Sequence, residues 1–166
     1  MTTSNFIDHD TWFARLPGVV VSAGGLITDP AGRILLVKPN YRDHWTLPGG
    51  ICEHAEPPHA ACAREVREEI GLDLPVGRLL VIDWAAPDGD RPNPIMHFVF
   101  DGGTLAGPAG IVLQQEELDD YQFTDPAAVA GYLPPFIAPR IPAALAARAS
   151  GITSYLPAAL SGPPFA

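Results

Sequence analysis

The stretch that decides the fold of this chain is Gly49–Leu72, which reads GGICEHAEPPHAACAREVREEIGL. It predicts a helix over residues 57–70, because Pro57 and Pro58 suit a first turn that has no N–H partner to lose and Gly71 suits a C-terminal stop. Five of the seven glutamates of the chain lie in this stretch: Glu53, Glu56, Glu65, Glu68 and Glu69. The arrangement of these carboxylates on the helix is the first clue to chemistry.

Three of the glutamates share one face of the predicted helix. At about 100° per residue, Glu68 and Glu69 lie about 60° and 40° to either side of Glu65. A different side of the helix is apolar and is formed by Ala63, Val66 and Ile70. The helix therefore offers an apolar side to a core and a dense patch of negative charge elsewhere.

This acidic patch is unfavourable unless something neutralises it. Like charges four residues apart destabilise a helix by ~0.2–0.5 kcal/mol, and an anion in the last turn opposes the helix dipole by ~0.3–1 kcal/mol. A divalent cation would reverse the sign of both effects, and local rules are most often broken at functional sites. The alternative is a solvated acidic surface that Arg64 and Arg67 neutralise.

The type of ligand narrows the choice of metal. Carboxylate oxygens without clustered His or Cys suit Mg²⁺, Mn²⁺ or Ca²⁺ and do not suit structural zinc. The other candidate ligands show no metal-ligand spacing and are expected to serve packing or surface roles: His44, His54, His59 and His97. The sequence thus indicates a site for a hard cation on the helix.

The stretch also resembles a known family. The Nudix hydrolases share the signature G-x5-E-x7-R-E-U-x-E-E-x-G-U, in which U is a bulky aliphatic residue. Every position of that signature is filled here, by Gly50, Glu56, Arg64, Glu65, Val66, Glu68, Glu69, Gly71 and Leu72. One departure lies beside it, because many members have Gly before the first glutamate of the signature and this chain has Ala55.

The resemblance implies a role for each matching residue. Glu65, Glu68 and Glu69 match the metal-binding glutamates, and Glu56 matches a loop glutamate that assists with metal or water. Arg64 matches the arginine that orients a carboxylate of the catalytic helix. The residue that takes the proton from the attacking water varies within the family, so the candidates stay open: Glu68, Glu69, Glu56 and the later pair Glu116 and Glu117.

The function that the resemblance implies is hydrolysis of a pyrophosphate bond in a nucleoside diphosphate-linked or related small molecule, with Mg²⁺ as cofactor or Mn²⁺ in its place. A catalytically silent nucleotide-binding sensor is the main alternative, which the intact glutamates disfavour. An isomerase on the same fold is a second one, for which Cys52 and Cys62 lack a suitable context.

Further charged residues are candidates for contacts to the substrate. Arg33, Lys38 and Arg42 are candidate phosphate contacts, with ordinary surface charge as the alternative. Glu116 and Glu117 precede a strand-like segment, where some family members carry a loop glutamate. For either of the two, a solvated loop position is the alternative.

The rest of the chain predicts strands on either side of this helix. Apolar, β-branched runs indicate a hairpin of strands over 19–28 and 33–39, closed by the turn at 29–32, and later strands. The later strands are expected over 79–85, 94–102, 111–113 and 117–123, with helices over 125–132 and 142–150. The order predicts an α+β fold, a mixed sheet covered by helices on two sides, which agrees with the α/β/α sandwich that the resemblance implies.

Length suits one domain, expected over residues 1–150 with a lead-in over residues 1–18, and the Pro-containing segment 151–166 is expected to be an extended tail. The hydrophobic content of 47% and the charged content of 17% exclude a largely disordered chain. The formal net charge of -9 argues against polymeric nucleic acid and anionic membranes as partners.

The expected partner is therefore a small-molecule diphosphate, with a homodimer as a further expectation. The start of the chain lacks the basic and apolar regions of a secretory signal, and Cys52 and Cys62 form no CxxC pair. These features favour a cytoplasmic protein with reduced thiols.

Overall fold

The sheet is mixed and has seven strands, in the spatial order β6-β2-β1-β5-β4-β7, with β3 paired to β1. The computed structural model describes residues 8–87 and 91–157. The strands are β1 Val20–Thr28, β2 Ile34–Pro39, β3 Gly49–Ile51, β4 Leu79–Ala85, β5 Ile95–Thr104, β6 Leu118–Thr124 and β7 Ser154–Pro157. The pairs β1–β5 and β4–β7 are parallel, and the other pairs are antiparallel. The predicted mixed sheet is confirmed.

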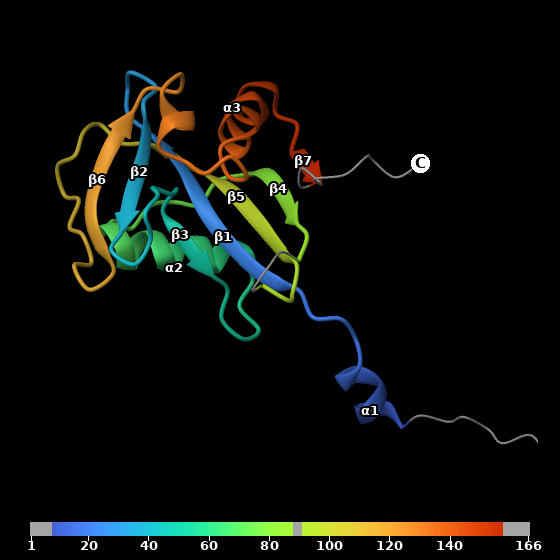
Figure 1. The fold of residues 1–166 in the computed structure, drawn as a ribbon. Helices are drawn as coiled ribbons and strands as arrows, with labels where there is room; N and C mark the ends of the chain where they lie inside the picture. Colours follow the sequence, from blue (N-terminus) through green and yellow to red (C-terminus); the bar gives the residue numbers. More distant parts are fainter. Residues whose placement is uncertain (1–7, 88–90, 158–166) are drawn as a thin grey trace, which may run out of the picture.

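Helices cover both faces of this sheet (Figure 1). Alternate residues of β2 point to opposite faces: Ile34 and Leu36 belong to the core beneath α3, Arg140–Ser150, whereas Leu35 belongs to the core beneath α2, Pro58–Ile70. Strands buried on both faces read as continuous apolar runs. The predicted sandwich of helix, sheet and helix is confirmed.

Helix α2 lies close to the sheet because β1 carries small residues there. Its buried side is formed by Ala61, Cys62, Val66, Glu69 and Ile70. A Cβ atom at Gly25 of β1 would come within 3.5 Å of Val66 and 3.7 Å of Cys62, which is ordinary contact. The helix ends at Gly71, whose left-handed φ of 71° allows its N–H to bond the carbonyl of Arg67.

Helix α3 is attached to the other face by two arginines. Arg140, at its first residue, donates from Nε to Oδ2 of Asp83 on β4 at 2.6 Å, and both side chains are buried. Arg148, in its last turn, donates to Asp101 on β5 and to the carbonyl of Leu26 on β1. These bonds fix both ends of α3 on the sheet.

Several elements differ from those that the sequence predicts. Residues 111–113 form no strand, because the N–H of Val112 bonds the carbonyl of Ile70 and so follows the end of α2. The expected helix over 125–132 is only the short 3-10 helix η1, Val129–Gly131. Strand β3 has no counterpart among the strands that the sequence predicts.

The two ends of the described chain also hold unexpected structure. Within the predicted lead-in, α1, His9–Ala14, stands away from the sheet (Figure 1). Within the predicted tail, β7 pairs in parallel with β4, and the remaining residues 158–166 lie outside the described residues. No helix among the described residues is long and apolar enough to span a membrane.

Candidate active site

The site is built where the segment Gly49–Glu56 crosses the acidic side of α2. Strand β3 pairs with β1 through glycines, with Gly49 opposite Gly24 and Gly50 opposite Ala23. Any side chain at Gly50 would collide with the carboxylate of Glu65, and one at Gly49 would collide with the backbone of β1. The two glycines therefore allow the backbone to lie directly against a glutamate of the helix.

Arg64 holds the carboxylates of the loop and the helix together. Its Nε and Nη2 donate to the two oxygens of Glu56 at 3.0 and 2.9 Å, a bidentate arrangement. Its Nη1 donates to Glu65 at 2.9 Å and to Glu68 at 3.0 Å. Hydrogen bonds from Arg64 and from the N–H of Glu53 lower the pKa of Glu56 to about 2. Glu56 is thus a fixed anion whose charge orients the guanidinium.

Glu69 is the most deeply buried acid of the helix, with 6% of its surface exposed. Burial, together with the charges of Glu65 and Glu117, raises the pKa of Glu69 to about 8. The N–H of Gly49, which donates to its Oε2 at 2.7 Å, has the opposite effect and lowers the pKa. Burying a carboxylate is costly unless a positive group compensates it. Glu69 therefore needs either a proton or a cation close to it.

The three helix glutamates differ in exposure. The side chain of Glu65 is 15% exposed, and burial raises its pKa. The side chain of Glu68 is 47% exposed. The site thus grades from the buried Glu69, through the partly enclosed Glu65, to Glu68 at the surface. Glu69 belongs to the buried side of α2, which the sequence predicts to be apolar.

The charges of two residues outside the signature act on this site. The charge of Glu117 raises the pKa of both Glu65 and Glu69, and the charge of Arg42 lowers that of Glu69. Asn40 holds the Glu117 segment against the end of β2, because its N–H bonds the carbonyl of Glu117 at 2.9 Å. Sequence reasoning missed Asn40; its place directly after β2 and ten residues before the signature was the available signal.

The other candidate substrate residues lie in different places. The ammonium group of Lys38 donates to the carbonyls of Pro39 and Arg42, so it supports the loop that carries Arg42. Glu116 is exposed, and its carbonyl accepts from Asn40. Arg33 lies at the far end of β2 and is paired with Asp29 at 2.6 Å. The structure does not bring Arg33 to the helix glutamates.

The donor set suits a divalent cation, although the side chains are not gathered around one point. Among residues 8–87 and 91–157, no three His, Cys, Asp or Glu side chains converge as a ready metal centre. Arg64 takes one oxygen each of Glu65 and Glu68 instead. All the donors are hard carboxylate oxygens, and within the described part of the chain the buried Glu69 is bonded by the N–H of Gly49 and by no cation, so the residues fit Mg²⁺ or Mn²⁺.

Ala55 shows what the departure from the signature does to the backbone. It is the one non-glycine residue of the described chain with a positive φ, at 61°. This left-handed conformation costs an L-residue roughly 1–2 kcal/mol. The loop therefore keeps a glycine-like path without a glycine, and Glu56 still reaches Arg64.

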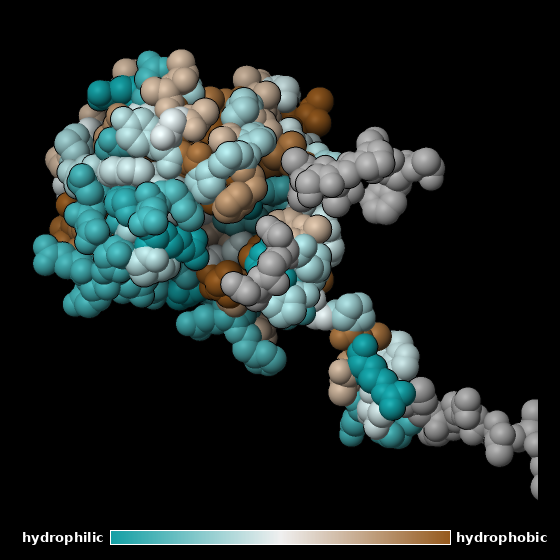
Figure 2. All heavy atoms as spheres, viewed as in Figure 1, coloured by the Kyte–Doolittle hydropathy of each residue, from teal (hydrophilic) through white to brown (hydrophobic). Residues whose placement is uncertain are grey.

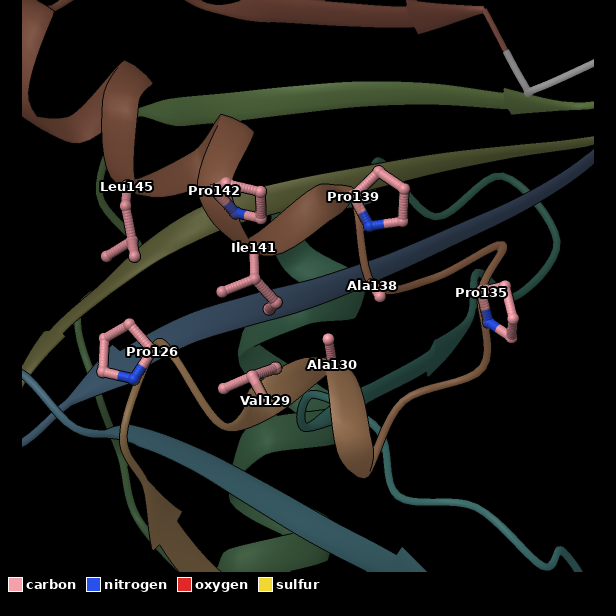
Figure 3. Close-up of a pocket in the computed structure, with 9 residues that line it drawn as sticks. All are labelled: Pro126, Val129, Ala130, Pro135, Ala138, Pro139, Ile141, Pro142 and Leu145. Carbon is pink, nitrogen blue, oxygen red and sulfur yellow. The ribbon is translucent and has the colours of Figure 1, made fainter.

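Two hollows in the described part of the chain differ in their relation to the acidic cluster: Glu56 lines the first, and no residue of the cluster lines the second. One, of about 560 Å³, lies beside the loop that carries Glu56. The other, of about 350 Å³, lies between η1 and α3 and is lined by apolar and proline side chains such as Val129, Ile141 and Pro139 (Figure 3). The residues that line the second hollow are uncharged, which gives it no direct means of binding an anionic group.

Comparison with known proteins agrees with this geometry. A family model described as NUDIX domain matches residues 18–145. A MutT-like protein of Streptomyces ambofaciens is 39% identical over 59 residues, 36% of this chain and 38% of that protein. Diphosphoinositol polyphosphate phosphohydrolase 2 of Rattus norvegicus is 47% identical over 49 residues, 30% of this chain and 27% of that protein. The matches thus span well under half the length of these two relatives.

Solved structures show the same fold. The MutT protein of Methanosarcina mazei Go1 superposes with a TM-score of 0.68 at 23% identity, covering 80% of this chain and 96% of that one. The family match extends over most of the chain and includes β1, the loop, α2 and β6. The chain therefore belongs to the Nudix family.

Proposed function

We propose that this protein is a divalent-metal-dependent hydrolase that cleaves a pyrophosphate bond in a small molecule, such as a nucleoside diphosphate linked to a second group. The observation that carries the proposal is the buried Glu69, which lies beside Glu65 and Glu117 with no cation within bonding distance among the described residues. A relative named for a diphosphate substrate, diphosphoinositol polyphosphate phosphohydrolase 2, supports the type of bond.

Glu65, Glu68 and Glu69 would hold the ion, Mg²⁺ in the first place and Mn²⁺ as a substitute. When bound, such an ion polarises a phosphoryl oxygen and lowers the pKa of water. It would also neutralise the repulsion between a diphosphate and a chain with a net charge of -9. The carboxylates themselves supply the charge and the fixed positions.

The other site residues position the reactants. Arg64, anchored by Glu56, is placed to orient Glu65 and Glu68. Glu68 and Glu117 are the preferred acceptors for the proton of the attacking water, because both are exposed, whereas Arg64 binds both oxygens of Glu56 and the pKa of Glu56 is lowered to about 2, which makes it a weak base. Arg42 is the preferred phosphate contact, with Lys38 as support for its loop.

The test is a screen of diphosphate compounds with and without metal. Nucleoside diphosphate sugars, dinucleoside polyphosphates, nucleoside triphosphates and diphosphoinositol phosphates would be incubated with Mg²⁺ or Mn²⁺, and product would be followed by phosphate release and chromatography. Cleavage that a chelator abolishes and added metal restores is the expected result. Cleavage that is indifferent to chelators would overturn the proposal.

A matched pair of variants tests the residues. Glu68→Gln removes one charge from the cluster, and Asp73→Asn removes one just beyond the end of the same helix. We expect Glu68→Gln to lower turnover by about 10²–10⁴-fold and Asp73→Asn to leave it within a small factor. If every compound binds without being cleaved, the protein is a nucleotide-binding sensor.

A further inference from the structure

Asn40 bonds two successive carbonyl groups of the turn that carries Glu117. Its side-chain amide donates from Nδ2 to the carbonyl of Glu116 at 2.8 Å, and its backbone N–H donates to the carbonyl of Glu117 at 2.9 Å. Asn40 directly follows β2, and the turn over residues 115–117 directly precedes β6. Asn40 therefore ties this turn to the end of the neighbouring strand.

The backbone of Gln114 bonds the same turn. Its carbonyl accepts from the N–H of Glu117 at 3.0 Å and from the N–H of Leu118 at 2.9 Å. The N–H of Gln114 in turn donates to the carbonyl of Glu69 at 3.1 Å, in the last turn of α2. The turn is thus connected to β2 through Asn40 and to the acidic helix through Gln114.

These four hydrogen bonds fix the two peptide groups that flank Glu117. Peptide groups are planar, so the direction of a side chain is set once the planes before and after its residue are fixed. The group before Glu117 is bonded at its oxygen by Asn40 and at its N–H by Gln114. The group after it is bonded by the same two residues, through the carbonyl of Glu117 and the N–H of Leu118. Asn40 and Gln114 together therefore fix the direction of the Cα–Cβ bond of Glu117.

The carboxylate of Glu117 is placed to act on a bound molecule. Its side chain is exposed, and within residues 8–87 and 91–157 it takes part in no hydrogen bond or ion pair, so the backbone alone directs it. Its charge is nevertheless close enough to α2 to raise the pKa of Glu65 and Glu69. Figure 2 shows a largely hydrophilic surface at the lower left, over the start of β6 and the loop after β2, which water and a polar substrate can reach.

We propose that Asn40 is a positioning residue, whose side-chain amide holds Glu117 in the direction from which its carboxylate takes the proton of the attacking water. The proposal rests on the proposed function, in which Glu117 is one of the two preferred proton acceptors. Asn40 acts only through Glu117 in this role. The alternatives are an ordinary bond of a surface turn, and support for the following loop, which carries Arg42.

A double-mutant cycle separates these roles, with Mg²⁺ and the compound of the diphosphate screen that is cleaved fastest. Asn40→Ala should lower kcat by about 10- to 100-fold and leave KM within a small factor. In a Glu117→Gln background the same substitution should have no further effect, because the group that Asn40 positions is gone. Effects that multiply would mean that Asn40 acts without Glu117, and a raised KM with unchanged kcat would mean that it acts through the Arg42 loop. Either result overturns the proposal.

Two further variants keep the size and polarity of the change under control. Asn40→Gln retains an amide donor on a longer side chain and should recover part of the lost kcat. Gln115→Ala removes an exposed amide from the same turn, one that bonds no other residue of the described chain, and should leave kcat and KM within a small factor. A loss in Gln115→Ala as large as that in Asn40→Ala overturns the proposal, because any change in the turn would then suffice.

Hydrogen exchange tests the contact without substrate or metal. Asn40 is exposed, so the full chain should fold normally in Asn40→Ala. In NMR spectra, the amides of Glu117 and Leu118 should exchange several-fold faster in this variant, whereas that of Val66 in α2 should be unchanged. Unchanged exchange at Glu117 and Leu118 overturns the proposal. If the unmodified chain cleaves no compound, the proposed function fails, and exchange at these two amides still decides whether Asn40 holds the turn.

Discussion

Helices α2 and α3 lie on opposite faces of the sheet, and their last turns carry charges of opposite sign at the functional or anchoring positions. Both begin after a proline and end at a left-handed glycine, Gly71 or Gly151. The last turn of α3 carries Arg148, which bonds the sheet and suits the helix dipole. The last turn of α2 carries Glu68 and Glu69, which oppose the dipole. Helix α3 is thus arranged for stability, whereas α2 gives up stability to keep carboxylates at the site.

This contrast predicts that changes in α2 affect activity and that changes in α3 affect stability. The largest effect is expected for Glu69→Gln, which keeps the acceptor for the N–H of Gly49 but removes the charge. Turnover with Mg²⁺ should fall by about 10²–10⁴-fold, while metal-free stability in urea should not fall. Loss of stability without loss of turnover would contradict the assignment of α2.

Arg140→Ala tests the opposite helix. The Arg140–Asp83 pair is buried, with side chains 10% and 6% exposed, and removing one partner leaves a buried charge uncompensated. We expect a loss of about 3–5 kcal/mol in the free energy of unfolding, measured by urea denaturation. Asp83→Leu combined with Arg140→Met should recover most of that loss. A loss of less than about 1 kcal/mol in the single variant would mean that the pair contributes little to docking α3.

The same face of the sheet predicts a pH dependence of stability. The imidazole of His97 is bonded to Ser22 Oγ through Nδ1 at 2.6 Å and lies opposite Asp83 in the strand register. Although His97 retains some exposed surface, burial and then the charge of Arg140 lower its pKa well below the usual 6.5.

The sign follows from proton binding. Below pH 6.5 the unfolded chain takes up a proton that the folded chain refuses, so stability falls as the pH falls, by at most about 1.4 kcal/mol per pH unit from this group. Denaturation curves between pH 7 and pH 5 would measure how the free energy of unfolding changes with pH. His97→Gln should reduce this change. If the variant shows the same pH dependence as the unmodified chain, groups other than His97 cause it.

The smallest effect is expected at the loop before α2. Ala55→Gly removes the strain of the positive φ of 61°, but glycine also makes the unfolded chain more flexible. The net effect expected is a gain of about 0.5–1 kcal/mol in the free energy of unfolding. Ala146→Gly, at an exposed position of α3, should instead cost about 1 kcal/mol. Opposite signs in thermal denaturation confirm the strain at Ala55; equal signs would contradict it.

The sequence predicts the elements whose signals are local. The turn at Asp29–Gly32, the strands around it and the helix with its acidic face each follow from residues a few positions apart. The strand β7 and the short β3 were missed, because each is defined by pairing with a distant strand rather than by its own pattern. The apolar run Ile111–Leu113 predicts a strand but packs against the end of α2 instead.

The residues of the candidate site also fall into those that local spacing predicts and those that only the fold brings together. The helix spacing predicts that Glu65, Glu68 and Glu69 share a face, and the structure shows them beside Arg64 and Gly49. The spacing does not predict which distant charges join them. The charges of Arg42 and Glu117 act on Glu69 because both residues lie at the end of β2 where β6 begins, whereas Arg33 lies at the other end of β2. Assigning roles to such residues requires the topology of the sheet.

The position of Cys62 has a practical consequence for measuring motion in this protein. Its thiol is only 1% exposed between α2 and β1, and burial raises its pKa to about 12. Thiol reagents react with the thiolate, so Cys62 is protected until the helix separates from the sheet. In a Cys52→Ala background, the rate of alkylation of Cys62 therefore reports how often α2 separates from the sheet. Metal ions that bind the glutamates of this helix would slow the labelling, even without substrate.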